Sequence, residues 1–146
     1  MDKQDIKTRC QAKADELLDK YFGHLPKEPD YMKPTELDPG YTVSLPFSIE
    51  EEFWRFLDSL KAELAPDDKR PLEELLDRPL VRERIKEHYK EPVAKAFEDA
   101  SAVSFWEKLT VGNHEDVAHY LSLLEQYSRE LLEHMTTDFT ELGTTL

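Results

Sequence analysis

The stretch 112-GNHEDVAHYLSLLEQYSRELLEHM-135 carries the clearest periodic pattern in the chain. Most of its apolar residues recur three, four or seven positions apart, the period of one face of a helix. Asn113 precedes the pattern, and asparagine is a favourable N-cap. We therefore predict a long helix from about residue 113 whose core face consists of Val117, Leu121, Leu124, Leu131, Leu132 and Met135.

Two histidines bracket two acids where this helix is expected to begin. His114 and His119 are five positions apart, whereas the zinc-protease pattern HExxH places its histidines four apart on one helical face. Glu115, Asp116 and His119 share faces and are candidate metal ligands only if a third group is supplied from elsewhere. Acids in a first helical turn also interact favourably with the helix dipole. We interpret the segment as a capped helix start and expect no metal or cofactor.

The charge of the chain is strongly negative and unevenly distributed. The net charge is -13 over 146 residues, and residues 98–146 contribute ten acids against two bases, or -8. Phosphate binding requires clustered Lys and Arg, so direct nucleic-acid binding is disfavoured. The acidic C-terminal third instead favours a protein partner with a basic surface, and a nucleic-acid mimic is the alternative.

The N-terminal segment predicts another amphipathic helix. Over residues 3–22 one face carries Ile6, Cys10, Ala14, Leu17 and Tyr21, and Gly23 follows as a possible C-cap. Cys10 is the single cysteine of the chain, so we interpret it as a small buried hydrophobe in a reducing compartment. The sequence shows neither a signal peptide nor an apolar run of membrane-spanning length, and a cytoplasmic location is expected.

Residues 23–47 contain five of the nine prolines and predict a break between the first two helices. Within this segment 41-YTVSLPF-47 alternates in polarity, with Tyr41, Val43, Leu45 and Phe47 on one side, which is the period of a strand. We expect either an extended proline-rich arm over the helices or a short β-hairpin with residues 31–37.

Further helices are predicted downstream of this arm. Ser48 begins a capping-box pattern, 48-SIEE-51, which predicts a helix from Ser48 to about Leu64 with Trp54 on its flank. Helical pieces are expected at 71–77, 78–91, 92–100 and 104–109, and Pro92 either kinks the helix from residue 78 or restarts it. The whole chain, residues 1–146, therefore predicts one all-α domain, an irregular bundle of five to six helices.

A row of bases at intervals of four residues stands out in the predicted helix 78–91. Arg78, Arg82, Lys86 and Lys90 form a basic ridge beside acidic Glu83, Glu87 and Glu91, either as a solvated face or as a secondary docking edge. His88 shares a face with apolar residues and is expected as a hydrogen-bonded histidine in the core or at its margin, with a catalytic base as the alternative.

These patterns favour a small acidic intracellular interaction protein, such as a regulator, inhibitor or accessory subunit. No nucleophile or phosphate-loop motif is present in the sequence, and an enzyme or ligand-binding domain would need a pocket assembled only by the fold. Self-association through the arm is a further possibility. The residues expected to bind a partner are Tyr41, Val43, Leu45, Phe47, Trp54, Glu115, Glu130 and Glu133.

Overall fold

The computed structural model describes residues 2–23, 42–101 and 114–146; of residues 99–101 and 114–117 it describes the backbone only. Every element in these ranges is helical, which confirms the predicted all-α class. In chain order the elements are α1 (Lys3–Leu18), the π-helical turn η1 (Asp19–Gly23), α3 (Leu45–Leu64), α4 (Leu72–Leu75), α5 (Arg78–Ser101) and α7 (His114–Gly143).

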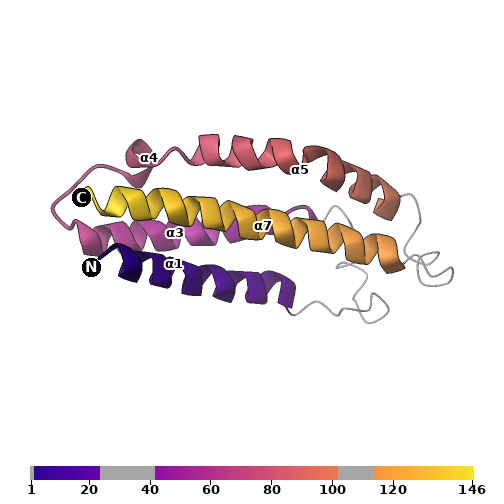
Figure 1. Cartoon of the computed structure of the whole chain (residues 1–146), viewed down its shortest axis with the longest axis horizontal. Helices are drawn as coiled ribbons and strands as arrows, with labels where there is room; N and C mark the ends of the chain where they lie inside the picture. Colours follow the sequence, from indigo (N-terminus) through magenta and orange to yellow (C-terminus); the bar gives the residue numbers. More distant parts are fainter. Residues whose placement is uncertain (1, 24–41, 102–113) are drawn as a thin grey trace.

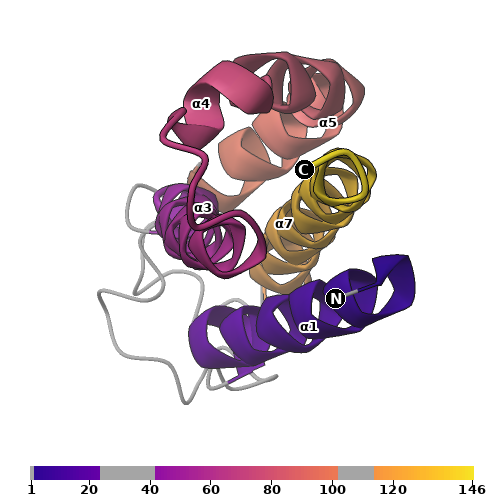
Figure 2. The ribbon, with the colours of Figure 1, turned by 90° about the vertical axis from the view of Figure 1, so that its left-hand side faces the viewer.

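The four long helices alternate in direction, and α7 lies among the other three (Figure 1). Helix α7 makes extensive contacts with α5, α1 and α3, and α1 also packs against α3. Viewed end-on, α7 lies between α5 and α1 and beside α3 (Figure 2). Helices α3 and α5 scarcely approach each other along their backbones. The bundle is therefore organised around its C-terminal helix.

The core confirms most of the predicted faces. On α1, Ile6, Cys10, Ala14 and Leu17 are buried, and the last turn of that helix widens into η1 before Gly23. On α7 the buried face extends beyond the predicted set: Tyr120, Leu124, Leu131, Leu132, Met135 and Phe139. Leu121 is only half-buried. Ser128, in the turn that the apolar pattern skips, is buried and donates to the carbonyl of Leu124 at 2.8 Å.

The strand predicted for residues 41–47 is wrong over the part that is described. Leu45 and Pro46 lie in the first turn of α3. Backbone N–H groups in a first turn have no partner within the helix, so a proline there costs no hydrogen bond. Leu45 precedes Ile49 by four positions, so helix formation buries it on the core side while Val43 and Phe47 are exposed. Tyr41 and the remainder of the expected arm or hairpin, residues 24–41, lie outside the described residues.

The capping box predicted at Ser48 is also wrong. Helix α3 begins one turn earlier, and the Ser48 hydroxyl donates back to the carbonyl of Ser44 at 3.4 Å instead of accepting from the residue 51 amide. Ile49, Phe53 and Leu57, which follow one another at intervals of four positions, are fully buried on the core face of the helix. Apolar periodicity thus located the helix, whereas the cap pattern misplaced its start.

Pro92, predicted either to kink the helix from residue 78 or to restart it, lies inside α5. The helix continues from Arg78 to Ser101 through Pro92, and Figure 1 shows it bending along its length. An internal proline removes one backbone hydrogen bond and tends to kink a helix rather than necessarily ending it. Pro92 lies on the exposed side, where the freed carbonyl can bind water. The predicted piece 104–109 lies outside the described residues.

A buried lysine holds the connection between α3 and α4. The Lys61 ammonium donates to the carbonyls of Asp68 and Arg70 at 2.7 and 2.6 Å. Asp68 also bonds to the side chain and amide of Arg70, and the guanidinium bond holds the pKa of the Asp68 carboxyl well below its usual range. Lys61 thus gives two carbonyls of the connection a hydrogen-bond donor from α3.

We expect Ser48→Ala to change the free energy of unfolding by less than about 0.5 kcal/mol, because Ser48 lies inside the helix and alanine has a high helix propensity. Phe53→Ala should lower it by about 3 to 5 kcal/mol, because the side chain is fully buried. Denaturant unfolding followed by circular dichroism measures both changes. A loss of about 1 kcal/mol for Ser48→Ala would restore the capping role and contradict the observed helix start.

Candidate functional site

A groove runs between α3 and α5 where the two helices diverge. It encloses about 680 Å³, and residues of α7 form its floor. On α5 the lining extends from Arg82 to Glu98, which corresponds to about 24 Å of helix rise. The residues that line it are Val43, Pro46, Phe47, Glu50, Arg82, Glu83, Lys86, Tyr89, Lys90, Val93, Ala94, Phe97, Glu98, Leu124 and Tyr127.

The groove exposes apolar surface on both of its walls. Phe47 is 60% exposed and Val43 is 43% exposed, and both stand at its α3 edge. Val93 and Phe97, one turn apart on α5, are half-buried on the opposite wall. Contiguous exposed apolar residues rimmed by polar ones are typical of an interaction surface.

A buried carboxylate fixes one end of the groove. Glu50 is 2% exposed and accepts from Arg78 Nε at 2.7 Å and from Arg82 Nη2 at 2.8 Å. Each guanidinium also lies over an aromatic ring: Arg78 over Trp54 at 4.9 Å and Arg82 over Phe47 at 5.7 Å. This cluster links α3 to α5 through side chains and holds Phe47 against the wall of α5.

The predicted basic ridge therefore divides into two pairs. Arg78 and Arg82 turn inward to Glu50, and Arg78 also pairs with the exposed Glu51. Lys86 and Lys90 remain exposed along the groove, and neither forms an ion pair with another residue in the described part of the chain. Half of the ridge is thus structural, and the other half faces the groove.

Two tyrosines pack together beside the groove floor. The ring centroids of Tyr89 and Tyr127 are 5.6 Å apart in an edge-to-face arrangement, and the Tyr89 hydroxyl donates to the Glu130 carboxylate at 2.8 Å. Burial, reinforced by this bond, raises the pKa of Tyr89 to about 12. Burial also raises the pKa of Tyr127. Both phenols therefore stay neutral near pH 7 and act as donors or apolar surface.

The acidic residues expected to form a partner surface on α7 are not equally available. Glu130 accepts from Tyr89 and also lies 3.9 Å from His134, so it belongs to the packing of α5 on α7. Glu133 is exposed. The side chains of Glu115 and Asp116 lie outside the described ones. Among the described acids of this face, Glu130 is thus engaged in packing and Glu133 is exposed to solvent.

The histidines do not form a site in the part of the structure that is described. His119 is exposed, and no group of three or more His, Cys, Asp or Glu side chains gathers around a possible metal position in the described ranges. His88 is exposed, with its ring 4.9 Å from that of Tyr89, so its expected place at the core margin is wrong. The helix turns that position outward while Val81 and Ile85 are buried.

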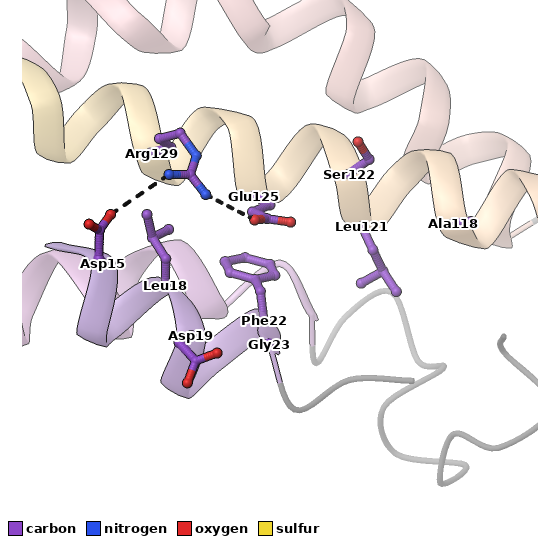
Figure 3. A pocket seen from close by; sticks show the side chains of 10 residues that line it. All are labelled: Asp15, Leu18, Asp19, Phe22, Gly23, Ala118, Leu121, Ser122, Glu125 and Arg129. Carbon is purple, nitrogen blue, oxygen red and sulfur yellow. Dashed lines mark hydrogen bonds and ion pairs between the residues drawn. The ribbon is translucent and has the colours of Figure 1, made fainter. Parts of the chain in front are cut away.

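A second pocket, of about 570 Å³, opens between the end of α1 and the N-terminal half of α7 (Figure 3). Arg129 spans its charged side, with Nη2 at 3.2 Å from Glu125 and Nη1 at 4.0 Å from Asp15. Asp19 also lines this pocket. Arg129, the one base among the described residues that line this pocket, is thus shared between Glu125 and Asp15. Of the residues that the structure describes, Phe22 is the one aromatic residue in this lining, whereas four aromatic residues line the groove.

Most groove residues were missed as site residues by the sequence analysis. Val93 and Phe97 are four positions apart, a spacing that indicates the buried face of a helix and not a binding site. Tyr127 lies between the predicted core residues Leu124 and Leu131. The signal that pointed here was the basic ridge, because Arg82, Lys86 and Lys90 follow one wall. Phe47 was identified as a contact residue, although for a strand rather than a helix.

Comparisons with known proteins leave the site to be interpreted on its own chemistry. No protein-family model, curated protein or solved structure matches this chain. Within the described residues, none of the helices is both long and apolar enough to cross a bilayer.

The buried Cys10 thiol should make stability depend on alkaline pH. Burial raises the pKa of Cys10 from 9.0 to about 12, so the unfolded chain loses this proton at lower pH than the folded chain does. The contribution is present below about pH 9 and is lost as pH rises, by up to about 1.4 kcal/mol per pH unit. Urea unfolding across this range should show a steeper decline in the parent than in Cys10→Ala. Parallel slopes would contradict a buried thiol.

Glu50→Gln should lower the free energy of unfolding by about 2 to 3 kcal/mol, because it removes the charge that Arg78 and Arg82 share. Both guanidinium groups are partly exposed, which keeps the loss below that of a fully buried pair. Glu51→Gln is the matched control and should cost less than about 1 kcal/mol, since Glu51 is exposed. Equal losses in denaturant unfolding would show that the Glu50 cluster does not join α3 to α5.

Proposed function

We propose that this protein is a small interaction module that receives an amphipathic helix of another protein in the groove between α3 and α5. The observation that carries the proposal is the groove itself, an open, largely apolar channel about 24 Å long on an otherwise highly charged chain. The proposal retains the expectation of a protein–protein function for this acidic chain. It moves the main contact from the acidic face of α7 to the groove.

The dimensions of the groove favour a helix over other peptide conformations. Its walls are two helices and its floor is a third, so an added helix would pack as helices do within a bundle. Addition of a strand requires an exposed sheet edge, and all described elements are helical. A helix of about 16 residues has the length of the lined part of α5.

The side chains of the groove fit the usual anatomy of an interface. Phe47, Val93, Phe97 and Tyr127 supply aromatic and apolar surface along the groove, and Lys86 is an exposed polar residue of the same lining. Aromatic side chains surrounded by a polar rim are enriched among residues that dominate binding energy. Phe47 is already oriented by Arg82, which reduces the ordering cost of binding.

The charged exterior supports a second, longer-range contribution. The net charge of -13 should attract a partner whose surface outside the docking helix is basic. A nucleic-acid mimic is less well supported, because bases such as Arg9, Arg84 and Arg129 pair with acids over the described surface and interrupt its negative potential.

Binding to a designed peptide tests the proposal. The probe is a fluorescent helical peptide of about 18 residues with leucines three and four positions apart and neutral polar residues elsewhere. We expect saturable binding in fluorescence anisotropy, and binding at least about tenfold weaker for a scrambled peptide that lacks one apolar face. Ala94→Trp, which places a large side chain in the groove from an exposed position, should weaken binding by about tenfold.

Lys95→Trp is the matched control, because Lys95 is exposed and adjacent to Ala94 but outside the groove lining. It should leave the affinity within about twofold. Equal binding of the scrambled peptide, or equal effects of the two tryptophans, would overturn the proposal. So would a concentration-dependent dimer that Ala94→Trp dissolves, or stronger competition by dodecanoate than by the peptide, since each identifies a different occupant.

A further inference from the structure

We infer that the groove selects a helix carrying acidic side chains on the flank that faces α5. This inference rests on the proposed helix-binding function and adds the charge and orientation of the partner. It runs against the overall charge of the molecule, since a chain of net charge -13 would by itself favour a basic ligand. The local arrangement of charges along the groove supports the opposite preference.

The middle of the α5 wall is basic. Lys86 and Lys90 are one turn apart, both are exposed, and neither is neutralised by an ion pair within the described residues. Side chains four apart on a helix are neighbours about 5 to 6 Å from each other. Two acids one turn apart on a docked helix would therefore face two lysines at matching spacing.

The nearby acids do not cancel this pair. Glu50 is buried and already shared between Arg78 and Arg82. Glu83 lines the groove one turn before Lys86, Glu98 lines it two turns after Lys90, and Glu87 and Glu91 lie outside the lining. Within the described residues Glu83, Glu87 and Glu91 form no ion pair with either lysine. A ligand charge placed midway along the groove is thus closest to the two lysines.

Distance decides between the local lysines and the distant acids. At physiological ionic strength the screening length is about 8 Å, so exposed charges beyond it contribute little. Lys86 and Lys90 would be in direct contact with a docked helix, while the acids of α1 and of the α3–α4 connection lie on other parts of the molecule. Contact charges therefore determine which flank is preferred, and net charge mainly affects the approach of the partner.

The test compares three peptides that share one apolar face and differ at two flank positions, one turn apart in the middle, occupied by Glu, Gln or Lys. We expect the Glu peptide to bind about tenfold more tightly than the Lys peptide at about 0.1 M salt, with the Gln peptide between them. The ratio should shrink at about 0.5 M salt. Anisotropy titrations with the full chain measure it.

The charge-reversal variant Lys86→Glu with Lys90→Glu should invert this order, so that the Lys peptide binds more tightly. The control is Lys7→Glu with Lys69→Glu, two exposed lysines outside the groove that change the net charge by the same amount, four units. This control should keep the preference for the Glu peptide.

The outcomes separate the inference from the function on which it rests. If the Lys peptide binds as tightly as the Glu peptide or more tightly to the parent chain, or if both double variants shift the order equally, net charge governs and the inference is overturned. Binding of the Gln peptide would then still support a helix-binding groove. If none of the three peptides binds, the proposed function itself fails.

Discussion

The structure depends on α7 burying side chains against three helices at once. Its buried residues, from Tyr120 to Phe139, span most of the helix and contact α1, α3 and α5. Burial of apolar surface is the main favourable term in folding, so each of the other helices is stabilised chiefly by contact with this central one. Because α3 and α5 each bury their apolar faces against α7, the bundle is stable although these two helices make few backbone contacts with each other.

The groove is a consequence of this arrangement. Helices α3 and α5 meet at side-chain level through the Glu50 cluster, and beyond it they leave a channel floored by Leu124 and Tyr127. A buried ion pair contributes modestly to stability when compared with apolar packing, but it is directional and fixes where two elements meet. The same cluster orients Phe47, so the contact that joins the helices also shapes the apolar end of the groove.

The charges of the chain act at two distances. Many acids on the surface take part in exposed ion pairs such as Lys3–Glu141 and Arg9–Glu63, which contribute little to stability and are screened by salt. Lys86 and Lys90 are different because they border an apolar channel, where a partner would displace water and strengthen each contact. A predominantly acidic chain can therefore present a basic contact at the place where binding is proposed.

The sequence alone determined the helical class and much of the core. Steps of four among Ile6, Cys10 and Ala14, and again among Ile49, Phe53 and Leu57, identify buried faces because an α-helix has 3.6 residues per turn whatever it packs against. Leu131, Leu132 and Met135 were recognised for the same reason. Helix ends were harder to predict, since Leu45 belongs equally well to an alternating strand pattern and to a helical one.

Tertiary structure decided the start of α3, the continuity of α5 through Pro92 and the division of the basic ridge. Each depends on a neighbour that is distant in sequence: Leu45 is buried only within the assembled bundle, and Arg82 turns inward because Glu50, 32 positions earlier, lies opposite it. The groove could not be predicted because Val93 and Phe97 have the spacing of core residues whether a neighbouring helix covers them or not. Local periodicity shows that a face is apolar, and only packing in three dimensions decides what covers it.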